Sequence, residues 1–428
     1  KVLVLDAGTR IGDCARLLEV SASFGARRLV VCVNDPDASR ARDRLAELKG
    51  ARPHVSGPAA AEMDARIAAL EGELAANPYH FDRRFLFQVL NMGHAQFAEY
   101  IGARGPNYGT NGACATATQA VGLAQDLIRE GRARRVIVIT GDDPNTDAMF
   151  RWFSAGFLAS GTAATDARVE DAALPFDRRR HGLIVGMGGA ALVMESLDAA
   201  AERGVSPICE VMGTVVANSA FHGSRLDVGH IVGVMEKLVS EFEARWGISR
   251  REIAREMVFV SHETYTPARG GSASAEVHAL RKVFGPDVDS IVIANTKGYT
   301  GHAMAVGIED ALAVRMLETG IVPPVPNLRE MDPELGPLNL SKGGSHPVRW
   351  ALRLGAGFGS QIAMSLLRWT PPPDGQRRAV SDVGFRHRVA DPAPCQTKCP
   401  VTRRATSPRS RARNRRSTKI AKNRSPWP

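Results

Sequence analysis

A cysteine at position 114 lies in a glycine-bracketed bend that opens into a run of small residues. Apolar residues recur at helical spacing through Ala117, Val121 and Ile128, so the sequence predicts a helix from Cys114 to Arg129. Unpaired N–H groups and the helix dipole favour an anion at a helix start, and the thiolate is the nucleophilic form of cysteine. We therefore expect Cys114 to ionise readily and act as a nucleophile, although the motif alone would favour a buried structural cysteine.

Two histidines follow predicted strands and are candidate partners of this thiol. His262 comes directly after the apolar run 257–261. Lys297 and His302 follow a second apolar run, 290–294, in a short loop. The sequence thus predicts that all three side chains leave the carboxyl ends of strands.

A glycine-rich turn at 355–360 separates two further apolar runs, and such a backbone can approach a ligand closely. A helix is expected from Ala303 to Leu317, after the second histidine loop. In open α/β sheets, reactive groups gather outside the carboxyl ends of the strands. We therefore expect four loops, including the Cys114 bend, to converge on one site.

Taken together and in this order, the motifs resemble those of the β-ketoacyl synthases, the condensing enzymes of fatty-acid and polyketide synthesis. The resemblance covers about residues 70 to 370 and rests on Ala-Cys-Ala around Cys114, Pro-Phe-Asp at 175–177, His-x-Thr-x-Thr of His262, Thr264 and Thr266, Lys-x-x-x-Gly-His of Lys297 to His302, and Gly-Phe-Gly at 357–359. It implies an α/β chain with the thiolase-like fold, a duplicated α/β/α/β/α layered arrangement.

The resemblance also implies a mechanism. Cys114 would take an acyl group from its carrier as a thioester, which splits a difficult carbon–carbon bond formation into two steps. The backbone N–H groups of Cys114 and Phe358 would form the oxyanion hole. His262 and His302 would donate hydrogen bonds to the carbonyl of a malonyl-type thioester and stabilise the enolate left after decarboxylation.

Other positions carry supporting roles by the same resemblance. Lys297 would organise the site electrostatically, with Glu276 as its suggested ion-pair partner; the alternative is a surface lysine. Phe358 would gate the site beside the cysteine, or be a plain core residue. The substrate channel would include Thr264, Thr266, Tyr265, Gly357 and Gly359.

Particular residues distinguish relatives of this fold. A thiolase would carry a second cysteine in the loop 355–360, which has none, and starter-type condensing enzymes would carry Asn where His302 stands. The sequence therefore favours an elongating, Cys-His-His condensing enzyme. Several positions depart from the family pattern, namely Glu263, Tyr265, Met187, Ser360 and Ile362. Because Glu263 and Tyr265 would add a charge and bulk beside the pantetheine entrance, a second hypothesis is a catalytically weak scaffold that binds acyl carriers or partner subunits.

Charge and composition divide the 428 residues into three parts. Residues 371–428 carry fifteen Lys and Arg against three Asp, whereas the whole chain has a net charge of +10. This tail is rich in Arg, Pro and Ser, so we expect disorder rather than a folded unit, and nucleic-acid binding is the less favoured alternative. Residues 57–370 form the predicted ketosynthase domain. Residues 1–56 read as strand, helix and strand, a divergent or truncated first unit or a linker fragment, with a reductase role less favoured.

The expected partners follow from the family resemblance. Substrates would be acyl and malonyl-type thioesters carried on the phosphopantetheine of an acyl carrier protein, with no bound cofactor and no metal, and the chain would form a homodimer. Six cysteines and the need for a free thiol fit a reducing compartment, so we expect a cytoplasmic protein without a membrane segment. The chain begins at Lys1 and not at a methionine, which would suit part of a larger synthase. Chain length, starter and extender are not readable from the sequence.

Overall fold

The structure is a computed structural model that describes residues 2–6, 28–32, 36–76, 92–144, 147–266 and 271–379. The chain divides into two units at residue 379, and the second unit lies outside the described residues. The helix expected between the first two strands also lies outside the described residues, as does most of the predicted tail. Among the residues that are described, no helix is both long and apolar enough to cross a bilayer.

The amino-terminal part contains the two predicted strands and two helices. Strands β1 (Val2–Asp6) and β2 (Arg28–Cys32) pair in parallel. Helices α2 (Pro36–Ala51) and α3 (Pro58–Ala76) follow. An ion pair joins Lys49 of α2 to Glu71 of α3, and Arg52, in the short turn after α2, pairs with Asp64 of α3. Residues 60–76, whose content of Ala and Glu is typical of a helix, all lie in α3.

A two-stranded antiparallel sheet and its helices form the next part. The elements in chain order are α5 (Gly93–Ile101), α6 (Thr116–Arg129), β3 (Arg135–Asp142), α7 (Asp147–Ala159), α8 (Val169–Ala172), β4 (Gly188–Glu195) and α9 (Leu197–Glu202). In β3 the side chains alternate, with Val138 and Thr140 turned inward and Ile137 and Ile139 exposed. The inward row packs on α6, since contacts join this helix to β3 and β4.

The larger sheet has five strands in the order β5-β9-β8-β6-β7. Its elements are β5 (Cys209–Asn218), α10 (Val228–Trp246), α11 (Arg250–Arg255), β6 (Met257–Val260), α12 (Ser272–Phe284), β7 (Val292–Ala294), α13 (Lys297–Thr300), α14 (Ile308–Thr319), β8 (Trp350–Gly357) and β9 (Gln361–Trp369). Strands β7, β6 and β8 are parallel, and β9 is antiparallel to β8 and β5. Strand β6 is buried along its whole length, as a central parallel strand must be.

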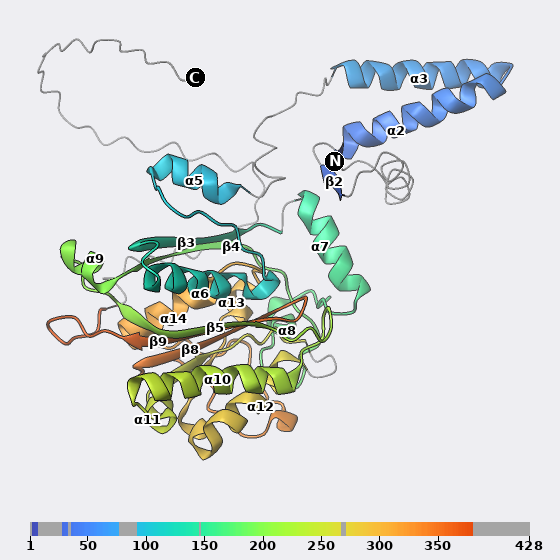
Figure 1. Ribbon diagram of the computed structural model, residues 1–428. Coiled ribbons are helices and arrows are strands. Elements are labelled where there is room, and N and C mark those ends of the chain that lie inside the picture. Colours follow the sequence, from blue (N-terminus) through green and yellow to red (C-terminus); the bar gives the residue numbers. More distant parts are fainter. Residues whose placement is uncertain are drawn as a thin grey trace, which may run out of the picture. The chain divides into compact units, whose positions relative to one another are not determined.

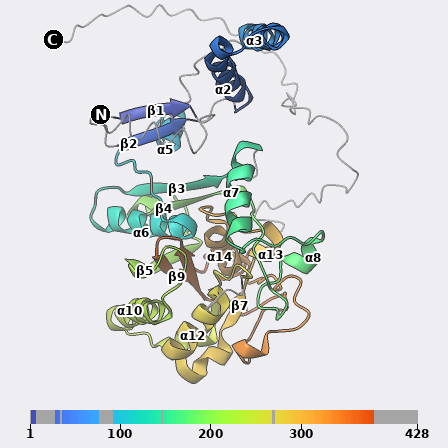
Figure 2. The ribbon, with the colours of Figure 1, turned by 90° about the vertical axis from the view of Figure 1, so that its right-hand side faces the viewer.

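Helices cover both faces of this sheet (Figures 1 and 2). Helices α6 and α14 lie between the two sheets and contact both, while α10 and α12 pack together on the opposite side. The main core lies under α10 and α12 and includes Met235, Leu238, Phe259 and Leu280. The described layers therefore run sheet, helices, sheet, helices, in agreement with the expected layered α/β fold.

Two boundaries differ from the predictions. The helix expected from residue 303 begins at Ile308, because Met304 has a positive φ of 48° and residues 301–307 form a loop. Residues 371–379, expected to begin the disordered tail, are described, and the Arg377 guanidinium stacks over the Trp369 ring at 3.8 Å. That cation–π contact holds the segment against the end of β9.

Candidate functional site

Cys114 lies in a tight 3₁₀ turn, Ala113–Ala115, immediately before α6. The amide of Ala115 donates to the carbonyl of Gly112 at 3.0 Å, which closes the turn. The hydroxyl of Thr116 accepts from the Gly112 amide at 2.9 Å and donates to the Ala113 carbonyl at 2.6 Å. Ala113 has φ of 49°, a left-handed conformation that costs a non-glycine residue energy. The bend is therefore fixed by its own hydrogen bonds and presents the thiol beside the helix start, as predicted.

His302 is the nearest partner of the thiol. Its Nε2 lies 2.9 Å from the Cys114 Sγ, although the two residues are 188 positions apart in the chain. The backbone amide of His302 donates to the Ile184 carbonyl at 2.7 Å, and the side chain is buried. The loop after α13 thus brings a histidine within hydrogen-bonding distance of the cysteine.

His262 completes the group from the end of β6. Its ring lies edge-on to the His302 ring, with 5.9 Å between centroids and 86° between planes. Its backbone amide donates to Glu276 Oε2 at 2.9 Å, and the Ser261 hydroxyl donates to the other oxygen of the same carboxylate. Glu276 thereby fixes the backbone that carries His262.

Burial sets the protonation of these groups. It lowers the pKa of His302 to about 3 and that of His262 well below its usual value, and the nearby Lys297 charge adds to both effects. Burial raises the pKa of Cys114 to about 11, against the opposing influence of Lys297. The expectation that Cys114 ionises readily is therefore wrong for the resting site, because desolvation outweighs the attraction of the Lys297 and Arg353 charges for the thiolate. The resting pair is a neutral thiol beside a neutral imidazole.

Lys297 is buried, so the alternative of a surface lysine is wrong. Its suggested pairing with Glu276 is also wrong: the Lys297 Nζ lies 2.7 Å from Glu309 Oε1 on α14. Burial opposes the charge of Glu309, but Lys297 and then Arg353 outweigh it and hold the pKa of this carboxyl at about 2. Glu276 instead has its pKa raised to about 8 by burial and by Glu263.

The Gly-Phe-Gly turn meets the cysteine bend directly. A Cβ added to Gly357 would lie 2.4 Å from the Gly112 carbonyl oxygen and 2.9 Å from the Cys114 amide nitrogen. Only glycine permits this approach. Phe358 is half exposed and stacks on Phe157 with 6.1 Å between ring centroids, so the alternative of a plain core residue does not hold.

The turn continues into a second set of contacts. Gly359 has φ of 76°, and its amide donates to the Gly223 carbonyl at 2.7 Å. The Ser360 hydroxyl accepts from the amides of Phe221 and His222 at 3.2 and 3.0 Å and donates to the His222 carbonyl at 2.7 Å. The serine that replaces a family glycine thus joins two loops.

The loop after His262 is more buried than we expected. Tyr265 has φ of 48°, is fully buried, and its hydroxyl donates to the Lys297 carbonyl at 3.4 Å. Thr264 is buried and shares a hydroxyl contact of 3.1 Å with the partly buried Thr266.

Glu263 does not place a charge at the entrance, which corrects that expectation. It is fully buried, accepts from the Ser272 hydroxyl at 2.6 Å and lies 3.6 Å from Arg180 Nε. Arg180 in turn pairs with Asp332 at 2.5 Å. The carboxylate is therefore partnered inside the protein.

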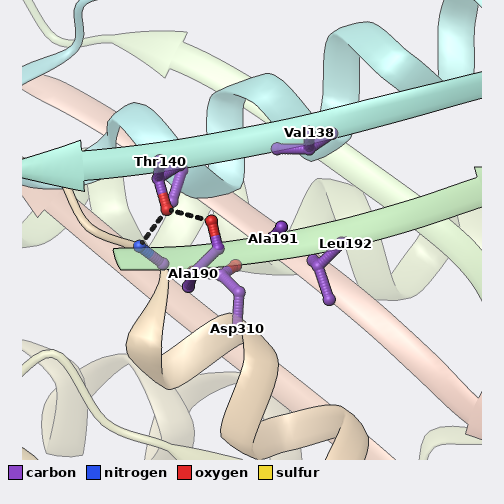
Figure 3. A pocket seen from close by; sticks show the side chains of 8 residues that line it. Val138, Thr140, Ala190, Ala191, Leu192 and Asp310 are labelled. Carbon is purple, nitrogen blue, oxygen red and sulfur yellow. Dashed lines mark hydrogen bonds between the residues drawn. The ribbon is translucent and has the colours of Figure 1, made fainter. Parts of the chain in front are cut away.

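A small cavity lies apart from this group, between the two-stranded sheet and the helices below it (Figure 3). Its lining residues are Ala117, Val138, Thr140, Ala190, Ala191, Leu192, Gly307 and Asp310. The Thr140 hydroxyl accepts from the Gly307 amide at 2.9 Å and donates to the Ala190 carbonyl at 3.1 Å, so α14 is tied to both strands at this point.

Comparison with known proteins identifies the family of the chain. The sequence profile of the β-ketoacyl synthase N-terminal domain matches residues 60–200, and that of the C-terminal domain matches residues 257–329; together they span half of the chain. The 3-oxoacyl-[acyl-carrier-protein] synthase 2 of Staphylococcus aureus (strain COL) is 28% identical over 284 residues, which are 65% of this chain and 66% of that protein. The protein of the same name from Synechocystis is 30% identical over 253 residues, or 58% of this chain and 57% of the relative. The chain thus spans less than two thirds of the length of these relatives, 66% of the first and 57% of the second.

Solved structures give the same fold. A ketosynthase in complex with its type II polyketide acyl-carrier protein aligns with a TM-score of 0.58 and 24% identity over 65% of this chain and 66% of its own. A β-ketoacyl synthase from Burkholderia phymatum aligns with a TM-score of 0.53 and 23% identity over 61% of each chain. The fold is thiolase-like, as predicted, and the chain belongs to the β-ketoacyl synthase family.

Proposed function

We propose that the protein catalyses decarboxylative Claisen condensation between a Cys114-bound acyl chain and a malonyl-type thioester on an acyl carrier protein, in fatty-acid or polyketide synthesis. One observation carries the proposal: the His302 Nε2 lies 2.9 Å from the Cys114 sulfur, and the His262 ring lies edge-on to the His302 ring, with 5.9 Å between the ring centroids. A cysteine flanked by two neutral, buried imidazoles suits acyl transfer followed by enolate stabilisation.

The first half-reaction loads the cysteine. As the sulfur attacks the carbonyl carbon of the acyl thioester, the Cys114 proton passes to His302 Nε2, the base within reach. The bond to the carrier sulfur breaks, and the carrier thiol leaves with that proton. Backbone N–H groups at Cys114 and Phe358 would hold the oxyanion, since the Gly357 contact brings these two segments together.

The second half-reaction forms the carbon–carbon bond. The bond from the malonyl α-carbon to its carboxylate breaks, carbon dioxide leaves, and the electron pair passes to the thioester oxygen as an enolate. His262 and His302 donate to this oxygen in their neutral N–H form, which their lowered pKa values preserve. The enolate carbon then attacks the acyl carbonyl carbon, and the bond to the Cys114 sulfur breaks. The released Cys114 thiolate takes up a proton from solvent, which restores the neutral thiol.

The partners belong to the same proposal. The relatives are named 3-oxoacyl-[acyl-carrier-protein] synthase 2, and one solved neighbour contains an acyl-carrier protein, which supports a carrier-bound substrate for this chain. We propose no bound cofactor, a cytoplasmic location and a homodimer.

The test separates the two half-reactions. Acyl loading from an acyl carrier thioester is followed by mass spectrometry, and carbon dioxide release from a malonyl carrier is followed in parallel. Cys114→Ala should abolish loading, whereas Cys209→Ala, a change at the other described free cysteine, should not. Because His302 acts in both half-reactions, His302→Ala should suppress decarboxylation and also slow loading. Retained loading in the Cys114 variant would contradict the proposal.

A scaffold that binds carriers without catalysis is the second candidate, and the raised pKa of the Cys114 thiol, about 11, favours it. Iodoacetamide distinguishes the two. Labelling of Cys114 that is faster than labelling of Cys209 supports a nucleophile, whereas equally slow labelling of both thiols supports the scaffold.

A further inference from the structure

Arg353 is a buried arginine in the middle of the larger sheet, four residues before the Gly-Phe-Gly turn. Only 2% of this residue is exposed, on strand β8, whose first seven residues are all buried. Its Nη1 donates to the carbonyls of Leu354 and Ser261, the latter at 3.4 Å. Ser261 directly precedes His262, so the guanidinium lies at the carboxyl end of β6.

The rest of the guanidinium faces two neighbouring carboxylates on α14. Nη2 lies 3.7 Å from Glu309 Oε2, and Nε lies 3.6 Å from Asp310 Oδ2. Both carboxylates are buried, and Lys297 pairs with only one of them. A buried charge without a counter-charge is costly, so one lysine is not enough for two carboxylates.

The contact between Arg353 and Asp310 joins two unsatisfied atoms. The Arg353 Nε and the Asp310 Oδ2 are both buried and lack a hydrogen-bond partner, so the ion pair at 3.6 Å is the contact between them. The second oxygen of Asp310 accepts from the Thr118 hydroxyl at 2.9 Å. Thr118 belongs to α6, one turn after Cys114. A chain of charge and hydrogen bonds therefore runs from β8 through α14 to the nucleophile helix.

We propose that Arg353, on the strand β8 that contacts the Cys114 turn, is a positioning residue that acts on Cys114 in two ways: it supplies a second positive charge near the thiol, and through Asp310 and Thr118 it holds α6 against α14. The inference rests on the proposed role of Cys114 as a nucleophile. In this role the charge of Arg353 changes the electrostatic potential at the Cys114 thiol, which a residue that only fills the core would not do.

The charge of the alkylating reagent provides the test. Iodoacetamide is neutral and iodoacetate is an anion, so the ratio of their rates at Cys114, measured by peptide mass spectrometry, reports the local potential. Arg353→Met should lower the iodoacetate-to-iodoacetamide ratio about fivefold, as expected for loss of a nearby unit charge. Asp310→Asn should raise the ratio, and the double variant should return it close to that of the unchanged protein.

Two controls complete the design. Arg353→Lys keeps the charge and should keep the ratio. Arg349→Met removes an arginine that is half exposed just before β8 and should leave the ratio unchanged. If Arg353→Met does not fold, Asp310→Asn still carries the opposite prediction by itself.

The outcomes separate this inference from the proposed function. Failure of both reagents to label Cys114 in the unchanged protein would overturn the nucleophile itself. Selective labelling with a ratio that neither Arg353→Met nor Asp310→Asn alters would overturn only the role of Arg353. A fall in melting temperature with both rates reduced equally would likewise mean a purely structural role.

Discussion

Replacing Glu309 by glutamine tests the buried ion pair with Lys297. The two charged atoms lie 2.7 Å apart, and both side chains are buried. The carboxyl pKa, lowered from 4.5 to about 2, corresponds to roughly 3 kcal/mol in favour of the charged form. Removing one partner of a buried pair typically costs about 3–5 kcal/mol, so the two estimates agree. We expect Glu309→Gln to lower the free energy of unfolding by about 3 kcal/mol at pH 7.

The effect depends on pH with a definite sign. Because the folded-state pKa of Glu309 lies below its ordinary value, its stabilisation is fully present above about pH 4.5 and is lost as the pH falls through about 2. In the variant, burial lowers the pKa of the unpaired Lys297. Lys297 loses its proton as the pH rises, so the difference in unfolding free energy between the Glu309→Gln variant and the unchanged protein should become smaller toward alkaline pH.

Urea denaturation measures these free energies. The double variant Lys297→Met with Glu309→Gln should cost less than either single change, since no unpaired charge remains. Glu330→Gln, which breaks an exposed pair of 2.8 Å with Arg178, should cost less than about 1 kcal/mol. A loss below 1 kcal/mol for Glu309→Gln, or additive costs in the double variant, would refute the argument.

Two further changes probe the turn beside the cysteine. Gly357→Ala should lower both the melting temperature and the alkylation rate of Cys114, because the new methyl group would lie 2.4 Å from the Gly112 carbonyl oxygen. The control is Gly233→Ala in α10, where a methyl group would have nothing within 4 Å. This change should lower neither the melting temperature nor the alkylation rate. Ser360→Ala should destabilise the protein to urea by roughly 1–3 kcal/mol through its lost hydrogen bonds. Since residue 360 has φ of 63°, Ser360→Gly should cost less, and equal costs would contradict this account.

The sequence predicted much of the convergence of the site because three of its four motifs follow strands, whereas Cys114 follows α5 and the irregular residues 102–112. His262 stands at the end of β6, and Lys297 and His302 follow β7. Parallel strands present their carboxyl ends at one edge, so strand order alone brings these loops near each other. The helix after Cys114 was also predictable, since its apolar spacing is regular.

Other features depend on packing that no local pattern encodes. Glu276 on α12 and Glu309 on α14 are both helical glutamates, and only the placement of α14 between the sheets decides that Glu309 meets Lys297. Burial, which raises the pKa of Cys114, is likewise a property of the assembled layers. Arg353 gave no signal, because an arginine within an apolar run looks like an edge or surface position.

The partnered state of Glu263 limits how this loop can be exchanged with those of other condensing enzymes. Its carboxylate depends on Ser272 and Arg180, and Arg180 is shared with Asp332. A chimaera in which residues 261–266 are replaced by a loop without a carboxylate at position 263 would leave Arg180 with one fewer ion-pair partner. A homologue that receives the glutamate alone would bury a carboxyl group without its partners Ser272 and Arg180. Arg180, Glu263 and Ser272 must therefore be exchanged together when this loop is transferred.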